Sequence, residues 1–201
     1  MIKISKKNIQ IKNKLFFKSS IGNIKLFFID KIVYIPTNIN IKKINNKIFF
    51  ETTLGILSLI LIDNIFIFIK KNKLLININL EKRKKSVLNL YNKLIKIKIK
   101  GVLQGFKISL ILKGIGFKAF IENKNLILKL GFSHPIKIEI PSNIEIINQS
   151  NTLIFSSIDF IFLNQFVHYI KNYKKPEPYK GKGLLLKNEK IFQKEGKKSK
   201  K

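Results

Sequence analysis

Apolar and polar residues alternate along most of the chain, and this period of two predicts β-strands with one face on a core and the other in solvent. The alternation is plain at Ile39–Lys42, Ile76–Asn79 and Ile136–Ile140. Short polar interruptions between such stretches predict hairpin turns, because Asn, Asp, Ser and Pro favour turn conformations. We expect these turns at Asn45-Asn46, Asn72, Glu122–Asn125 and Pro141–Asn143.

The longest apolar run, Leu54–Ile69, is interrupted at Asp63-Asn64. As a helix it would reach only about 24 Å, which is short of the ~30 Å hydrocarbon core of a bilayer. The run therefore predicts two buried strands with a turn at Asp63-Asn64. Residues 1–17 contain no continuous apolar segment of the kind found in signal peptides, so we expect no cleaved targeting segment.

Two stretches change to the spacing of an amphipathic helix. The apolar positions of the first are Val87, Leu88, Tyr91, Leu94 and Ile95. Glu81 near its start suits the positive end of the helix dipole. The apolar positions of the second are Phe162, Phe166, Tyr169, Ile170 and Tyr173. We expect Ser157 or Asp159 to cap the second helix and Pro176 to end it.

An internal repeat precedes each predicted helix. The strand pair in residues 64–76 has the same internal spacing as that in residues 143–155, with Asn72 corresponding to Asn151. A competing register pairs Ile35–Ile39 with Ile140–Ile144, but it does not align the helices, so we interpret it as local strand chemistry. Chance similarity stays an alternative for both registers in a sequence so poor in residue types.

These elements predict an α+β protein with two tandem copies of a small unit, each of mostly antiparallel strands packed on one helix, and an extended basic C-terminal tail. We expect an N-terminal extension (residues 1–34), a first repeat (35–100), a second repeat (101–175) and the tail (176–201). Because the tail is rich in lysine and poor in apolar residues, we expect it to order only on a partner.

The charge points to a polyanionic partner. Lys and Arg number 40 against 11 Asp and Glu, which gives a formal net charge of +29. Nucleic acid is the first candidate and an anionic membrane surface the second. Arg83 is the only arginine, and lysine, as a point charge, suits contact with phosphate better than bidentate reading of bases. The excess of Ile, Lys, Asn and Phe indicates a genome biased toward A/T codons.

Few residues suit catalysis, so we expect no enzyme, no cofactor and no metal site. The chain has no cysteine and two histidines, His134 and His168, and we interpret His168 as a boundary or surface residue of the second helix. Ser133 next to His134 is not a catalytic pair, because neighbours in an extended chain point apart. Lys180–Gly183 does not follow a strand and open a helix, as a phosphate loop would. The scattered acids argue against a metal-dependent nuclease.

Two segments fit contact with a polyanion. In Leu112–Lys118, two glycines between strands allow close backbone approach, either to another strand or to a phosphate. The second segment, KKPEPYKGKG at 174–183, combines stiffening prolines, glycines that expose the backbone, lysines for charge and Tyr179 for stacking on a base or sugar. We expect this segment to bury almost nothing of its own.

KKPEPYKGKG resembles the C-terminal signature of the universal family of large-subunit ribosomal protein six. Further motifs of that family occur in the same order, namely Gly101–Phe106, Leu112–Lys118, the Gly-Phe-Ser-His-Pro loop at 131–135 and the ending at 194–198. In the first half, Ile35–Ile39 and Asn45–Ile48 are similar to the family's opening hairpin. Residues 1–34 have no counterpart that we align.

The resemblance implies a structural component of the large ribosomal subunit that binds large-subunit rRNA near the sarcin–ricin loop and the factor-binding region. Neighbouring ribosomal proteins would be partners, with translational GTPases nearby, and no membrane is implied. The rRNA-binding residues that it implies are Lys113, Gly114, Gly116, Phe117, Ser133, His134, Lys174, Lys175, Pro176, Pro178, Tyr179, Lys180, Gly181, Lys182 and Gly183.

The compartment is suggested by composition together with the resemblance. The A/T bias and the bacterial-type signature suggest an organelle-encoded protein of a mitochondrial ribosome, with a plastid-type organelle or an A/T-rich bacterium as alternatives. The alternative function is a basic peripheral protein that binds another RNA or an anionic membrane. A membrane-surface protein would present an amphipathic helix with a lysine-rich polar face. The basic residues 82–85 instead adjoin an ordinary core stripe.

Overall fold

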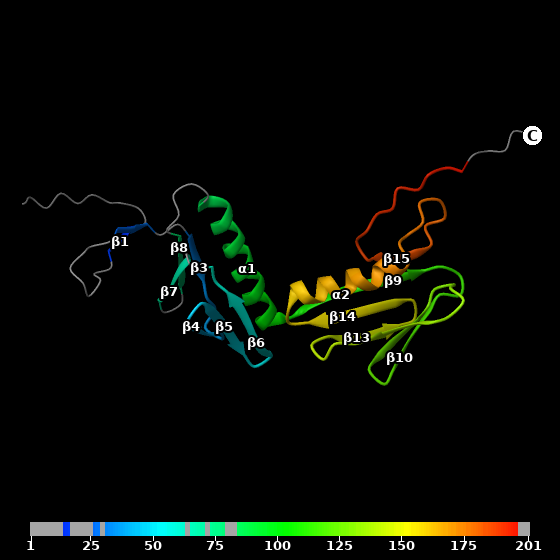
Figure 1. Cartoon of the computed structure of the whole chain (residues 1–201), viewed down its shortest axis with the longest axis horizontal. Helices are drawn as coiled ribbons and strands as arrows, with labels where there is room; N and C mark the ends of the chain where they lie inside the picture. The colour runs from blue at the N-terminus through cyan, green and yellow to red at the C-terminus, as the bar shows by residue number, and fades with distance from the viewer. Residues whose placement is uncertain are drawn as a thin grey trace, which may run out of the picture. The chain divides into compact units, whose positions relative to one another are not determined.

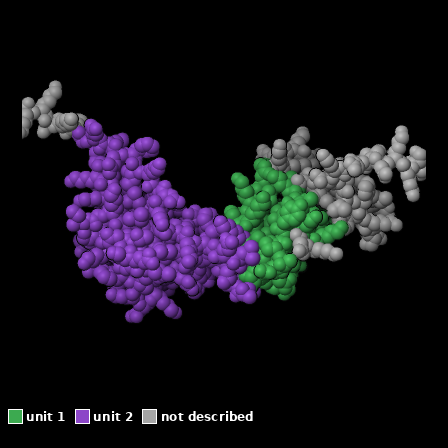
Figure 2. Space-filling model, turned by 180° about the vertical axis from the view of Figure 1, so that it is seen from behind, with its two compact units in different colours: residues 1–52, 58–99 green, residues 53–57, 100–201 purple. Residues whose placement is uncertain are grey.

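The chain forms two compact units in a computed structural model (Figures 1 and 2). Unit 1 consists of residues 1–52 and 58–99, and unit 2 consists of residues 53–57 and 100–201. The structure describes residues 14–16, 26–28, 31–62, 65–70, 73–78 and 84–196. The predicted turns at Asp63-Asn64 and Asn72, the helix-start residue Glu81 and the last five residues of the tail lie outside the described residues.

Unit 1 is built from short antiparallel strands and most of helix α1 (Lys84–Gln104). One sheet has the order β3-β8-β7, and these strands are β3 (Lys31–Tyr34), β8 (Lys73–Ile78) and β7 (Ile65–Lys70). The other has the order β4-β5-β6, with β4 (Asn40–Ile44), β5 (Lys47–Thr52) and β6 (Gly55–Ile60). The core of unit 1 contains the fully buried Phe50 together with fully buried Ile and Leu side chains from the strands and α1.

The N-terminal residues contribute strands of their own. Strands β1 (Lys14–Phe16) and β2 (Leu26–Phe28) pair antiparallel with each other. β3 pairs with β8 in register, with Ile32 opposite Leu75. Residues 31–34, which we expected to be the end of an extension, therefore form an edge strand of the first sheet.

Unit 2 has a larger antiparallel sheet covered by helix α2 (Phe160–Tyr173). Its order is β13-β14-β9-β15, and the strands are β13 (Glu145–Gln149), β14 (Thr152–Ser157), β9 (Phe106–Lys113) and β15 (Gly183–Leu186). A second sheet has the order β10-β11-β12, with β10 (Lys118–Glu122), β11 (Asn125–Lys129) and β12 (Ile136–Glu139). Leucines of both sheets and of α2 enclose the fully buried Phe155.

The same order of elements occurs in both units. A strand, a three-stranded antiparallel sheet, a two-stranded hairpin and a helix follow one another, first from β3 to α1 and then from β9 to α2. The hairpins β7–β8 and β13–β14 are the segments that repeat in the sequence. The predicted α+β fold with two tandem copies is therefore confirmed.

The competing register of the repeat reflects one local turn used twice. The backbone N–H of Ile39 donates to the carbonyl of Pro36 at 3.4 Å, and that of Ile144 donates to Pro141 at 3.0 Å. The first turn lies between β3 and β4, whereas the second lies between β12 and β13. The two segments therefore match in turn chemistry and occupy different places in the two units.

Helix α1 confirms the predicted stripe and is longer than expected. Leu88, Tyr91 and Ile95 are buried, as the period of the sequence predicts, and Val87 and Leu94 are half-buried. The helix continues to Gln104, past the expected boundary at residue 100. Residues 101–104, which resemble the family's entry into its second domain, are therefore the last turn of this helix.

The predicted stripe of α2 is confirmed at Ile170, and the half-buried Phe166 and Tyr173 also pack against the core. At Phe162 and Tyr169 the buried residue is instead the next one along the chain. The buried residues are Leu163, Val167 and Ile170, whereas Phe162 and Tyr169 are 37% and 53% exposed. Apolar residues occur on nearly every side of this helix, so the period alone does not select the buried side. The cap is as expected, because Asp159 accepts a hydrogen bond from the N–H of Ile161 at 3.1 Å.

The apolar run at residues 54–69 forms β6 and β7, but its strands are not buried on both faces. Ile56 and Ile60 are 62% and 65% exposed, whereas Leu59 and Leu61 are buried. In β7, every second residue at the start of the strand is buried. The strands thus follow the ordinary alternation of a sheet with one solvated face. The high share of isoleucine, which the composition attributes to A/T-rich codons, explains why the outward positions are also apolar.

Candidate nucleic-acid interface

The turn between β9 and β10 is a tight loop around Phe117. The N–H of Phe117 donates to the carbonyl of Gly114 at 3.3 Å, and Gly116 has a φ of +78°, which favours glycine. A Cβ atom at residue 114 would lie 2.8 Å from the Phe117 ring. The close approach that Gly114 permits is therefore to this ring, whereas Gly116 serves the turn through its positive φ. Lys113, Ile115 and Gly116 remain exposed around it.

The Gly-Phe-Ser-His-Pro loop joins β11 to β12 and lies against the same ring. A Cβ atom on Gly131, whose φ is +75°, would lie 3.4 Å from Phe117 Cε1. Ser133 and His134 are exposed, and Ser133 Oγ lies 3.3 Å from His134 Nδ1. The expectation that these two side chains point apart is wrong, because the loop is not extended here. The contact offers two exposed polar groups side by side.

The KKPEPYKGKG segment is a closed turn. The N–H of Gly181 donates to the Glu177 carbonyl at 2.9 Å, and the N–H of Glu177 donates to the Lys182 carbonyl at 2.8 Å. Gly181 and Gly183 are buried, with φ of +67° and +147°. The expectation that this segment buries almost nothing is wrong, because its glycines let the backbone fold onto itself. Pro178, Tyr179, Lys180 and Lys182 lie outward on the turn.

The tail after this turn packs on the sheet. β15 pairs antiparallel with β9, with Gly183 opposite Lys113, and Leu184 and Leu185 are 0% and 7% exposed. Farther on, the N–H of Lys194 donates to the carbonyl of Pro178 at 3.0 Å. The expectation that the whole tail is too poor in apolar residues to pack is therefore wrong for its first part, where consecutive leucines complete the core.

Contacts between these segments gather them into one surface of unit 2. The position of a Cβ on Gly181 is 3.4 Å from Lys113 Nζ, which joins the tail turn to the β9–β10 turn. Lys174 Nζ lies 4.7 Å from the centre of the Phe132 ring, which joins the C-terminal end of α2 to the Gly-Phe-Ser-His-Pro loop. Residues separated by more than forty positions in the sequence thus meet. We call the segments 113–117, 131–134 and 174–183 the basic surface.

The predicted residues differ in exposure on the basic surface. Those exposed to solvent are Lys113, Gly116, Ser133, His134, Lys175, Pro178, Tyr179, Lys180 and Lys182. Those half-buried are Gly114, Phe117, Lys174 and Pro176. The buried glycines and the half-buried ring hold the backbone in place, so the exposed lysines are left to meet a ligand.

Comparison with known proteins gives matches to one family. The sequence profile of the family "Ribosomal protein L6" matches residues 113–185, which include the whole basic surface. Large ribosomal subunit protein uL6c of Thalassiosira pseudonana is 42% identical over 61% of this chain and 66% of its own length. The uL6c protein of Phaeodactylum tricornutum is 39% identical over 67% of this chain and 78% of its own length. The uL6 protein of Mycoplasma capricolum is 41% identical over 66% of this chain and 75% of its own length.

The chain belongs to the ribosomal protein L6 family. Membership in this family of structural ribosomal components also means that the chain is not an enzyme. In the part of the chain that the structure describes, no helix is both long and apolar enough to cross a bilayer, and no cluster of three potential metal ligands occurs.

The basic surface also contains apolar residues that the sequence did not single out. Ile115, between the two glycines of the β9–β10 turn, is 95% exposed, and Phe132 is 44% exposed. An apolar side chain at the tip of a glycine turn was the available signal for Ile115, since a turn leaves its tip in solvent. Phe132 was missed because, within the Gly-Phe-Ser-His-Pro motif, only the Ser and His residues were interpreted as contacts with rRNA.

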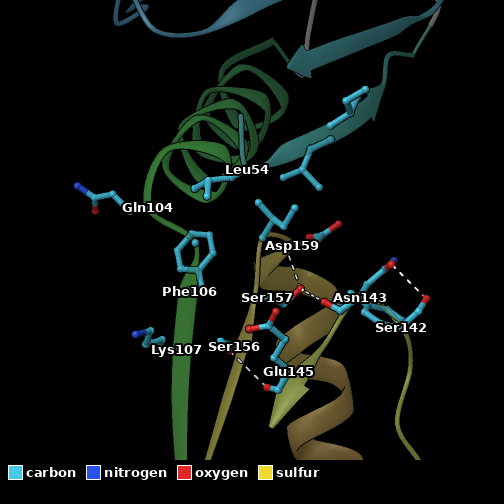
Figure 3. A pocket seen from close by; sticks show the side chains of 15 residues that line it. Leu54, Gln104, Phe106, Lys107, Ser142, Asn143, Glu145, Ser156, Ser157 and Asp159 are labelled. Atoms are coloured by element: carbon cyan, nitrogen blue, oxygen red, sulfur yellow. Dashed lines mark hydrogen bonds between the residues drawn. The ribbon is translucent and has the colours of Figure 1, made fainter. Parts of the chain in front are cut away.

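A cavity of about 610 Å³ elsewhere in unit 2 has polar groups that serve the fold (Figure 3). Ser157 Oγ donates to the Asn143 carbonyl at 2.7 Å and accepts from the N–H of Asp159 at 3.3 Å. Asp159 caps α2, and Leu54 and Phe106 provide apolar lining. These interactions fix the start of α2, so Ser157 and Asp159 have a structural role here.

Proposed function

We propose that the chain is a structural component of the large ribosomal subunit and binds large-subunit rRNA through the basic surface. One observation carries the proposal. The three segments to which the family resemblance assigns rRNA binding lie together on unit 2, with Lys113 beside Gly181 and Lys174 over Phe132. A surface of exposed lysines in a chain of net charge +29 suits a folded polyanion, since each phosphate contact releases a counterion.

The geometry suggests how this surface would hold RNA. Lys180 and Lys182 alternate with the buried Gly181 on the closed turn, so their ammonium groups stand on a fixed backbone. Lysines placed in this way contact phosphates without reading sequence. Tyr179, 55% exposed, would stack on a base or contact a sugar. From the family resemblance we also propose where on the rRNA the chain binds. The site lies near the sarcin–ricin loop and the factor-binding region, with translational GTPases close by.

Replacement of two lysines tests the proposal. Tagged K180E/K182E protein is expressed in cells beside the wild type, and its amount relative to rRNA is measured in purified large subunits. The matched control is K43E/K47E, which makes the same change of charge at exposed lysines of unit 1. We expect the first variant to be depleted from the subunits and the control to be incorporated normally. Equal incorporation of both would refute a role for the tail turn in assembly.

The ribosome concerned is organellar or bacterial, as the plastid-type and bacterial relatives indicate. Within that range we propose a mitochondrial ribosome, because the A/T-biased composition suits an organelle genome. Fractionation of organelles followed by detection of the chain in sedimented ribosomes tests this assignment. Recovery with plastid or bacterial ribosomes would replace it while leaving the rRNA-binding role intact.

A further inference from the structure

The three-stranded sheet β10-β11-β12 presents an aromatic side chain to solvent among lysines. Phe120 is 39% exposed and lies opposite Ile127 of β11, which in turn lies opposite Lys137 of β12. Ala119, Leu126 and Ile138 alternate with these residues and face the core. The outer face of this sheet therefore has a phenylalanine where an ordinary solvated strand has a polar residue.

The lysines on this face are arranged unfavourably for an isolated protein. Lys118 lies directly opposite Lys129 in the β10–β11 ladder, and like charges in that position repel. Among the described residues, no carboxylate forms an ion pair with Lys118, Lys129 or Lys137. Glu122 and Glu139 lie at the opposite end of the strands, both facing Asn125. The positive charge is thus concentrated at one end of the face, where an anion would relieve the repulsion.

This end of the sheet continues the basic surface. Lys118 directly follows Phe117, and Lys129 stands two positions before Gly131. The strand itself is held in place, because Asn148 Nδ2 donates to the Ala119 carbonyl at 2.6 Å. Lys129 Nζ lies 5.5 Å from the centre of the Phe120 ring. An exposed contact of this kind is weaker than stacking of a base on an aromatic ring, so an arriving base would displace the ammonium toward a phosphate.

We propose that this face is a binding site for single-stranded RNA, in which an unpaired base stacks on Phe120 while Lys118 and Lys129 contact the adjoining phosphates. The combination of an aromatic ring, flanking lysines and an open sheet face is the chemistry by which proteins hold unpaired nucleotides. The inference rests on the proposed function, because rRNA on the basic surface supplies the strand that reaches the sheet. It adds an aromatic contact with a base, besides the contact proposed for Tyr179, to the contacts of lysines with phosphates.

The test compares the full chain with F120L and F120Y, using a twelve-nucleotide single-stranded RNA and a hairpin RNA duplex as probes. Leucine keeps the apolar packing against Ile127 but lacks a ring, whereas tyrosine keeps the ring. We expect F120L to bind the single strand about tenfold more weakly, F120Y to bind it normally, and duplex affinity to be unchanged. Equal circular dichroism spectra and melting curves establish that both variants fold.

A photochemical measurement makes the outcome specific. With 5-iodouridine in the single strand, we expect a cross-link in the peptide that contains Phe120 and its loss in F120L. Unchanged affinity of F120L, or cross-links confined to other peptides, would overturn the inference, and so would an effect of F120L on binding of a protein but not of RNA. If K180E/K182E loses rRNA while F120L keeps all its single-strand affinity, the proposed function stands and the Phe120 site falls. If the wild type binds no RNA, both fall.

Discussion

Glu189 accepts two hydrogen bonds from the Lys171 ammonium, at 2.6 and 2.7 Å, and so fastens the C-terminal segment to the last turn of α2. The N–H of Leu186 also donates to this carboxylate at 3.1 Å. The hydrogen bond from Lys171, and to a lesser degree that from Leu186, lowers the pKa of Glu189 below its ordinary value of 4.5, although partial burial opposes the shift. The tail, which contributes its first residues to the basic surface, is therefore held on unit 2 by a charged contact as well as by the pairing of β15 with β9.

Acid should weaken this contact. A carboxylate whose pKa is lowered in the folded state contributes stability that is present above about pH 4.5 and is lost as the pH falls through the folded value. Hydrogen exchange at the amides of Leu184–Leu186 measures the effect. We expect E189Q to reduce the protection of these amides at pH 7. Because the variant lacks the titrating carboxylate, acidification should then cause little further loss of protection. Parallel pH profiles for the two proteins would show that the pair does not hold the tail.

Gly183→Ala should open the tail turn. A Cβ atom there would lie 2.6 Å from Pro176 Cα and 2.8 Å from the Lys175 carbonyl oxygen, in a backbone with φ of +147°. We expect a cost of about 2 kcal/mol or more for the docking of β15, read from hydrogen exchange of its amides. Gly196→Ala is the matched control, because no atom lies within 4 Å of its added methyl group. A cost equal to that of the control would contradict the observed turn.

The buried side of α2 is tested by two neighbouring substitutions. Leu163 is fully buried and Phe162 is 37% exposed. We expect Leu163→Ala to cost about 2–5 kcal/mol in the exchange-derived stability of unit 2. Phe162→Ala should cost clearly less, although it removes more atoms. The reverse order would restore the stripe that the sequence pattern suggested.

Salt should report how many phosphates the tail turn contacts. Each contact contributes roughly −0.7 to −0.9 to the slope of log affinity against log salt concentration. For the full chain on an rRNA fragment, K180Q/K182Q should therefore reduce the steepness by about 1.4–1.8. The same change in the control K43Q/K47Q should leave the slope unaltered. An unchanged slope in the first variant would mean that these two lysines do not meet phosphate.

Sequence reasoning succeeded where local spacing decides structure. The Asn72 and Asn151 repeat identified the corresponding hairpins β7–β8 and β13–β14, because strand period and turn residues are local signals. The stripe of α1 was predictable because Leu88, Tyr91 and Ile95 recur at helical spacing and most of the residues between them are polar. In α2 apolar residues lie on nearly all sides, so only packing against β9 and β14 distinguishes Leu163 from Phe162.

The interface itself was predictable only in part. Motifs named most of the residues on the basic surface, but not the packing that closes it. β15 depends on a long-range pairing with β9, and its local signal, Leu184–Leu186, follows a stretch of Pro, Gly and Lys that suggests an open chain. The like-charged pair of Lys118 and Lys129 beside Phe120 depends on strand register, which only the folded sheet fixes.

Ultraviolet cross-linking of the chain in living cells tests the central claim most directly, with sequencing of the attached RNA and mass spectrometry of the attached peptides. We predict large-subunit rRNA as the dominant RNA, joined to peptides from segments 113–117, 131–134 and 174–183. Absence of ribosomal RNA from the recovered particles, or attachment only through residues remote from these segments, would contradict the account.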